Sequence, residues 1–74
     1  MFYEHRKALP AALQRQLSIE AQEVYRTEFN RRAYYLARHV RHNGASVLET
    51  AHRYAWAKVR RQFRRDAHKI WQPL

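Results

Sequence analysis

One segment of this 74-residue chain gathers most of the side chains that could do chemistry. Placed on a helical wheel, residues 48–65 put bases on one side and apolar side chains within a sector of about 140° on the other. Guanidinium groups pair with phosphate or carboxylate oxygens, so this side predicts anion binding rather than catalysis. A solvated surface of an ordinary basic protein would show the same pattern. The candidate binding residues are Arg53, Tyr54, Lys58, Arg60, Arg61, Arg64 and Arg65.

Histidines are the other side chains that could do chemistry. His52 falls on the apolar side of the segment, where we expect its ring to hydrogen-bond a backbone carbonyl or a tyrosine hydroxyl. His39 and His42 have a spacing that could hold a metal, but Arg38 and Arg41 beside them would repel a cation. No Ser-His-Asp set, paired carboxylates or glycine-rich phosphate loop occurs in the sequence. We therefore expect no enzyme activity, no metal and no cofactor.

The charge is distributed unevenly along the chain. The net charge is +9, and residues 1–30 sum to zero, so residues 31–74 carry all of the excess. Such asymmetry favours a polyanionic partner. The chain has no cysteine and no apolar run long enough to span a membrane, and because no apolar h-region follows its first seven residues, we expect no secretory leader. These features predict a cytoplasmic protein without a membrane span.

The first two helices are marked by the residues that begin them. Pro10 suits the first turn of a short helix over residues 10–16, because its missing N–H would be unpaired there. Ser18 predicts the N-cap of a second helix over residues 19–42. Acids lie in the first half of that helix and arginines in the second, the order that the helix dipole favours.

A third helix is expected after a tight turn. Gly44 suits the left-handed residue that follows the second helix. Ser46 and Glu49 have the spacing of a capping box, which predicts a helix over about 47–66. Two long helices joined by a tight turn form an antiparallel hairpin.

These elements predict one mainly α domain over residues 1–74. It consists of a short N-terminal helix and the hairpin of two long helices. The terminal segments, residues 2–4 and 70–72, could pair as a small two-stranded β-ribbon if they pack on the helices. The predicted core residues are Tyr25, Phe29, His52, Trp56, Val59 and Phe63.

Two stretches carry a family resemblance. Residues 21–30 read Ala-Gln-x-x-Tyr-x-x-x-Phe-Asn, and residues 49–59 read Glu-Thr-Ala-His-x-x-Ala-Trp-Ala-x-Val. Together with Leu9-Pro10, Phe63 and Trp71, they resemble the small ChaB proteins, which are named as cation transport regulators. The resemblance implies a mostly helical fold in which the terminal segments form a small β-ribbon. It also implies an association with a cation antiporter.

Two departures from the ChaB pattern bear on function. The chain has Leu17-Ser18 where the family often has a second Leu-Pro, and serine can begin the helix equally well. The family tends to be acid-rich in the hairpin loop and after the third helix, where this chain is rich in arginine and histidine. The second departure favours nucleic acid as the partner.

Two functions follow as hypotheses. The first is a noncatalytic accessory protein that binds DNA or RNA mainly through backbone phosphates, using the basic face of the third helix. The second is a protein-binding regulator, of a transporter or an enzyme, whose cationic helix docks an acidic surface. Self-association into a homo-oligomer is a further expectation for so small a domain.

Overall fold

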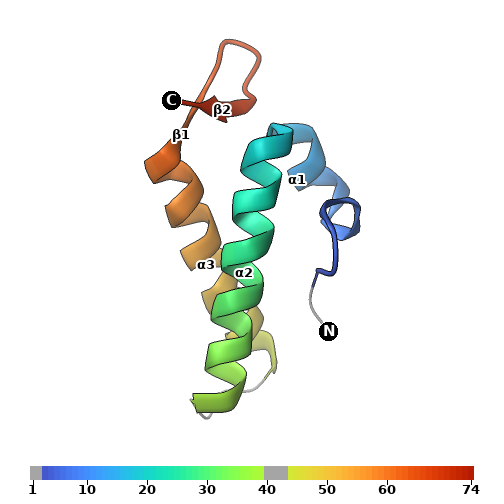
Figure 1. The fold of residues 1–74 in the computed structure, drawn as a ribbon, viewed down its shortest axis with the longest axis vertical. Coiled ribbons are helices and arrows are strands. Elements are labelled where there is room, and N and C mark those ends of the chain that lie inside the picture. Colours follow the sequence, from blue (N-terminus) through green and yellow to red (C-terminus); the bar gives the residue numbers. More distant parts are fainter. Residues whose placement is uncertain (1–2, 40–43) are drawn as a thin grey trace.

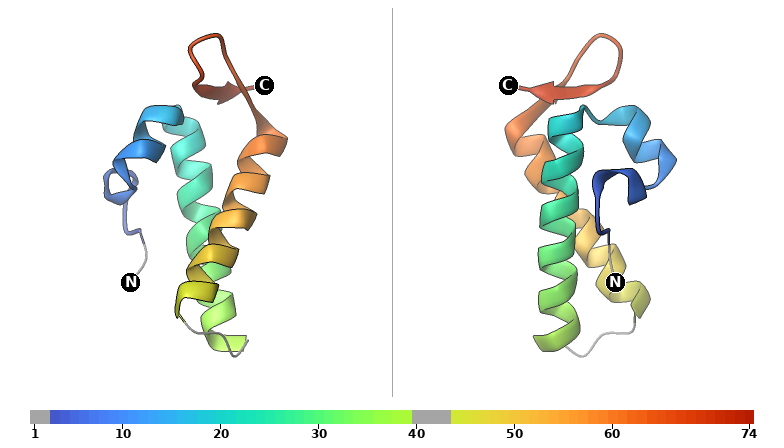
Figure 2. Two further views of the ribbon diagram at one scale, coloured as in Figure 1. Left: turned by 180° about the vertical axis from the view of Figure 1, so that it is seen from behind. Right: turned by 45° about the vertical axis from the view of Figure 1, so that its right-hand side comes forward.

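The computed structural model describes residues 3–39 and 44–74, and it is mostly helical (Figure 1). Two long antiparallel helices lie side by side, and a shorter helical segment runs beside the first of them. A small ribbon covers the end at which the second long helix finishes (Figure 2). The predicted fold class is confirmed. The elements in chain order are η1 (Arg6–Ala8), α1 (Ala11–Gln16), α2 (Ile19–His39), α3 (Gly44–Gln62), β1 (Phe63–Arg65) and β2 (Trp71–Pro73).

Helix α2 begins at the predicted cap. The backbone N–H of Ala21 donates to Oγ of Ser18 at 3.2 Å, which satisfies one of the donors left open at a helix start. Every fourth residue from Ala21 to Ala33 is buried, including Tyr25 and Phe29. The described helix ends at His39, and the predicted extension to residue 42 lies outside the described residues.

Helix α3 differs from its predicted range at both ends. It begins at Gly44, so Ser46 lies in its first turn and is not its cap. Gly44, predicted as the left-handed residue that ends the second helix, is instead the first residue of α3. The helix ends at Gln62 rather than at residue 66, because the backbone of the next three residues pairs with β2. Local capping patterns fix a helix start only to within a few residues.

The β-ribbon is present, and β2 lies at the predicted C-terminal segment, but its partner is β1 and not residues 2–4, of which Phe2 lies outside the described residues. β1 and β2 pair antiparallel, with Arg65 opposite Trp71. The N-terminal segment instead lies on α2, because the side-chain amide of Asn30 binds the backbone of Tyr3 at both of its polar groups. Asn30 Oδ1 accepts from the Tyr3 N–H at 3.0 Å, and Asn30 Nδ2 donates to the Tyr3 carbonyl at 2.7 Å. A side chain thereby takes the place of the expected strand partner.

Strand β2 is tied to the helices as well as to β1. The N–H of Ser18 donates to the carbonyl of Trp71 at 3.0 Å, and Leu17 forms a parallel bridge with Trp71. In the loop before β2, the Asp66 carboxylate accepts from the backbone N–H groups of residues 68 and 70. Lys69 in this loop has a φ of 63°, in the left-handed region. These bonds hold Trp71 against the start of α2.

The core lies between α2 and α3 and extends under α1. Four of the six predicted core residues are buried, and Trp56 is only partly buried. His52 is exposed, so its placement in the core is wrong. The buried stripe of α3 is narrower than the predicted apolar sector, because Leu48 and His52 are exposed and Trp56 is only partly buried. The buried apolar residues are Leu9, Leu13, Leu17, Ala21, Tyr25, Phe29, Ala33, Val47, Ala51, Ala55, Val59 and Phe63.

Candidate anion-binding site

The seven predicted binding residues do not form one continuous helical face. Five of them lie on α3, but Arg64 and Arg65 lie on β1 because the helix ends early. Lys58 is partly buried, and the other six side chains are exposed. The partners of each side chain show which of them are available to a ligand.

Lys58 belongs to a buried ion-pair network around Glu28. The Glu28 side chain is 3% exposed, and its carboxylate lies 2.8 Å from Arg32 Nε, 3.0 Å from an Arg31 nitrogen and 3.5 Å from Lys58 Nζ. Burial alone would raise the pKa of Glu28, but the hydrogen bonds from Arg32 and Arg31 and the nearby charges hold it below its ordinary value. The network joins α2 to α3. Lys58 therefore has a structural partner inside the molecule.

Arg53 also has an acidic partner, though a weak one. Its guanidinium lies 3.2 Å from the carboxylate of Glu49, one turn earlier on α3, and the two side chains are 76% and 67% exposed. Exposed pairs of this kind contribute little, so Arg53 can exchange Glu49 for another anion.

Tyr54 is covered on one face of its ring. The guanidinium carbon of Arg32 lies 4.2 Å from the ring centroid, which is a cation–π contact between α2 and α3. Tyr54 is 46% exposed, and its ring already has a cationic partner from α2.

The remaining four arginines gather at one end of the molecule, and we call them the arginine end. They follow one another closely on the last turn of α3 and on β1, and all four are exposed. None of them forms an ion pair with an acid in the described ranges 3–39 and 44–74. The guanidinium carbon of Arg60 lies 6.0 Å from the ring centroid of Trp56. The arginine end consists of Arg60, Arg61, Arg64 and Arg65.

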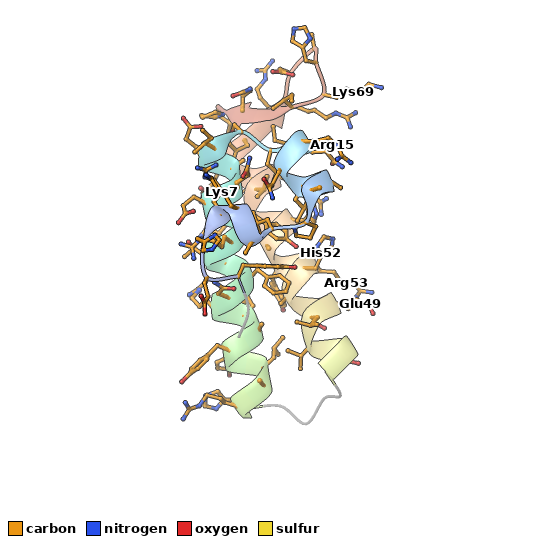
Figure 3. The ribbon with its side chains drawn as sticks, turned by 90° about the vertical axis from the view of Figure 1, so that its right-hand side faces the viewer. Lys7, Arg15, Glu49, His52, Arg53 and Lys69 are labelled. Atoms are coloured by element: carbon orange, nitrogen blue, oxygen red, sulfur yellow. The ribbon has the colours of Figure 1, made fainter. Side chains whose placement is uncertain are left out.

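A shallow recess of about 440 Å³ adjoins the arginine end. The rings of Trp56 and Trp71 meet edge to face in it, with their centroids 5.8 Å apart. The sequence analysis placed Trp71 in the expected C-terminal strand and in the family pattern, but it missed the position of Trp71 beside Trp56, because it paired that strand with residues 2–4. Figure 3 shows His52 and Arg53 of α3 on the same side of the molecule as Arg15 of α1. The recess is lined by Gln16, His52, Arg53, Trp56, Arg60, Arg65 and Trp71.

His52 is fixed by a buried tyrosine. The hydroxyl oxygen of Tyr25 lies 2.6 Å from His52 Nδ1. Although His52 is largely exposed, the partial burial of its ring, together with the charge of Arg60, lowers the pKa of His52, and burial raises the pKa of Tyr25. A neutral imidazole then accepts the tyrosine proton at Nδ1 and carries its own proton on Nε2. The predicted hydrogen bond to a tyrosine hydroxyl is confirmed, although the ring lies at the rim of the core.

No group of three histidine, aspartate or glutamate side chains within the described residues could hold a metal ion. His42, one half of the weak metal motif, lies outside the described residues. Within the same residues, none of the helices combines the length and the apolar composition that a membrane crossing requires.

The fold and the site define a small helical-hairpin protein with a cationic, aromatic end. The ChaB family model matches residues 9–73, and the chain belongs to the ChaB family. Proteins named "Putative cation transport regulator ChaB" from Escherichia coli K12 and from Shigella flexneri are each 32% identical over 72 residues, which cover 96% of this chain and 95% of the relative. An NMR solution structure of a protein of that name superposes with a TM-score of 0.81 at 30% identity, over 97% of both chains.

Proposed function

We propose that this protein is a noncatalytic regulator of cation transport that binds an acidic surface of a partner protein through the arginine end. One observation carries the proposal: four neighbouring exposed arginines have no acidic partner among the described residues. Side chains of this kind attract an acidic partner and orient it before contact. The name of the Escherichia coli relative supports a role in cation transport.

A protein partner fits the distribution of cations better than a nucleic-acid duplex does. Phosphates repeat along a duplex, and a face that tracks them needs available cations along its length. Here Lys58 is held by the buried Glu28, and Arg53 is held only weakly by Glu49, so the cations of this region without any acidic partner gather at one end, on the last turn of α3 and on β1. Nucleic-acid binding stays a prediction, and the experiment below decides between the two partners.

The proposal is tested by retention of a partner before and after nuclease treatment. The tagged protein is compared with a variant in which Arg60, Arg61, Arg64 and Arg65 are all replaced by glutamine. A second variant, Arg38→Gln, removes one positive charge at the far end of α2, where Arg38 bonds the Tyr34 hydroxyl. We expect nuclease-resistant retention of one specific protein by the wild type and by Arg38→Gln, and loss of that protein from the fourfold variant. Cation flux in cells that lack the wild-type protein should follow the same order.

Two results would contradict the proposal. Retention of the same protein by the fourfold variant would show that the arginine end is not the binding surface. Loss of all retained material on nuclease treatment, with direct binding of a duplex by the purified protein, would assign the arginine end to nucleic acid. In that case affinity should fall with salt at a log–log slope of roughly −3 to −4 for four phosphate contacts.

A further inference from the structure

The recess beside the arginine end combines two kinds of side chain that suit different parts of one ligand. Trp56 and Trp71 supply aromatic surface, and Trp56 is only partly buried in the core. Arg53, Arg60 and Arg65 supply guanidinium groups around that surface. An anionic group with an apolar neighbour would satisfy both, since the carboxylate would bind guanidinium and the apolar part would cover a ring.

Alternation along the chain explains why only part of the arginine end lines the recess. Successive side chains of a strand point to opposite faces, so Arg65 lines the recess while Arg64 does not. Successive residues of a helix differ by about 100° in direction, which likewise separates Arg60 from Arg61. Arg60 and Arg65 thus converge on the tryptophans, and the other two face elsewhere.

An apolar groove continues the recess toward the hairpin loop. It lies between α3 and the N-terminal part of the chain, and its lining includes Leu13, Phe29 and Leu48. Gln16, His52 and Trp56 line both the groove and the recess, so the two are contiguous. Leu48 is 46% exposed there. A ligand that enters the recess can extend along apolar surface, which suits a peptide better than a sugar-phosphate chain.

We propose that the recess binds an acidic segment of the partner protein that carries an apolar side chain. The carboxylates of the segment pair with Arg53, Arg60 and Arg65, and its apolar side chain covers Trp56 and Trp71. This inference rests on the proposed function, because it names the part of the partner that the arginine end receives. Tryptophan and arginine are among the residue types that carry most of the binding energy at protein interfaces.

The two tryptophans allow a direct test. They are the only tryptophans of the chain, and both line the recess, so intrinsic fluorescence reports its occupancy. The probe is a short synthetic peptide of glutamates with one central leucine. We expect a saturable change in tryptophan emission, a weaker affinity when the leucine is replaced by serine, and no binding when the glutamates are replaced by glutamine. The single-tryptophan variants Trp56→Phe and Trp71→Phe should both report binding, since each keeps one ring in the recess.

Arginine variants locate the binding. Arg60→Gln and Arg65→Gln should each lower the affinity for the peptide by roughly three- to tenfold, which is the range of one charge-assisted contact. Arg61→Gln and Arg64→Gln should weaken it less, through the general loss of charge, and Arg38→Gln should leave it unchanged. Circular dichroism spectra of all variants should match the wild type.

Three outcomes would overturn the inference. The first is an equal loss of peptide affinity in the four variants of the arginine end, and the second is a peptide affinity that does not depend on the leucine. Either would remove the recess site while the acidic-partner function, tested by retention of the partner, still stands. The third is displacement of the peptide by a single-stranded oligonucleotide that binds more tightly, which would assign the recess to nucleic acid. If the fourfold variant loses the partner and the peptide test also fails, the recess site is contradicted and the proposed function still stands.

Discussion

The hydroxyl of Tyr25, in the core, bonds Nδ1 of His52, at the rim, over 2.6 Å. The two side chains come from different helices, so the bond joins α2 to α3. It also fixes the imidazole beside the recess, because Nδ1 is occupied by the tyrosine proton. Protonation of His52 would turn Nδ1 into a donor and leave the buried hydroxyl proton without its acceptor.

The first prediction concerns pH. Since the pKa of His52 is lowered in the folded protein from an ordinary value of 6.5, the unfolded state binds more protons below that pH. The free energy of unfolding should therefore be highest above pH 6.5 and fall as the pH drops through the folded pKa. Urea unfolding at a series of pH values measures this. His52→Gln should remove the part of the decline that begins near pH 6.5, whereas His68→Gln, which leaves the Tyr25 bond intact, should keep it. The decline at more acidic pH, where carboxylates with a lowered pKa such as Glu28 take up protons, should remain in both variants.

The second prediction concerns the buried carboxylate. Glu28→Gln removes the common partner of Arg31, Arg32 and Lys58, and should cost about 1–3 kcal/mol of unfolding free energy. The cost stays below that of a fully buried pair, because the three cations can turn toward water. Glu49→Gln breaks an exposed pair and should change stability by less than about 1 kcal/mol. Equal effects of the two substitutions in chemical denaturation would show that Glu28 is not the centre of a network.

The third prediction compares two aromatic side chains. Phe29 is 4% exposed, so Phe29→Ala should lower the free energy of unfolding by about 3–5 kcal/mol. Trp56 is partly buried, so Trp56→Ala should cost less, about 1–3 kcal/mol, although tryptophan is larger. Thermal unfolding measures both. A greater loss at Trp56 than at Phe29 would place the indole in the core and argue against its role in an open recess.

The fourth prediction concerns the loop before β2. Lys69 has a left-handed backbone, with a φ of 63°, which is unfavourable for a side chain with a Cβ and costs glycine nothing. Lys69→Gly should therefore raise the free energy of unfolding by up to about 1 kcal/mol, after the greater flexibility of glycine in the unfolded chain is counted. Lys69→Ala keeps the Cβ and should show no gain. Urea unfolding measures both variants, and a lower free energy of unfolding for Lys69→Gly than for the wild type would contradict this prediction.

The helices could be predicted because their signals are local and repeated. A buried residue at every fourth position and a serine cap are enough to define α2, and the structure has both. The ribbon could not be predicted in the same way. Which strand pairs with β2 depends on where the Tyr3 backbone finds its hydrogen bonds, and a single asparagine on α2 provides them.

The residue types of the candidate site could be predicted from the sequence, but which of these residues lie together could not. Residue spacing places Lys58 among the arginines of α3, but only the fold shows that it faces Glu28, thirty residues earlier. The early end of α3 likewise turns Arg64 and Arg65 to opposite sides of a strand. Recognition of the recess required Trp71, whose position depends on pairing between distant segments and therefore leaves no periodic pattern in the sequence.

The bridge between Leu17 and Trp71 also has a consequence for the order of folding. Contacts within the helical hairpin join segments that are close in sequence, whereas this bridge joins positions 17 and 71 across nearly the whole chain. Closing so long a loop has an entropic cost that only the docked strand offsets. The hairpin should therefore form first, and Trp71 should dock in the last step. In stopped-flow refolding, the helical circular dichroism signal should then rise before the emission of Trp71 is recorded in a Trp56→Phe background.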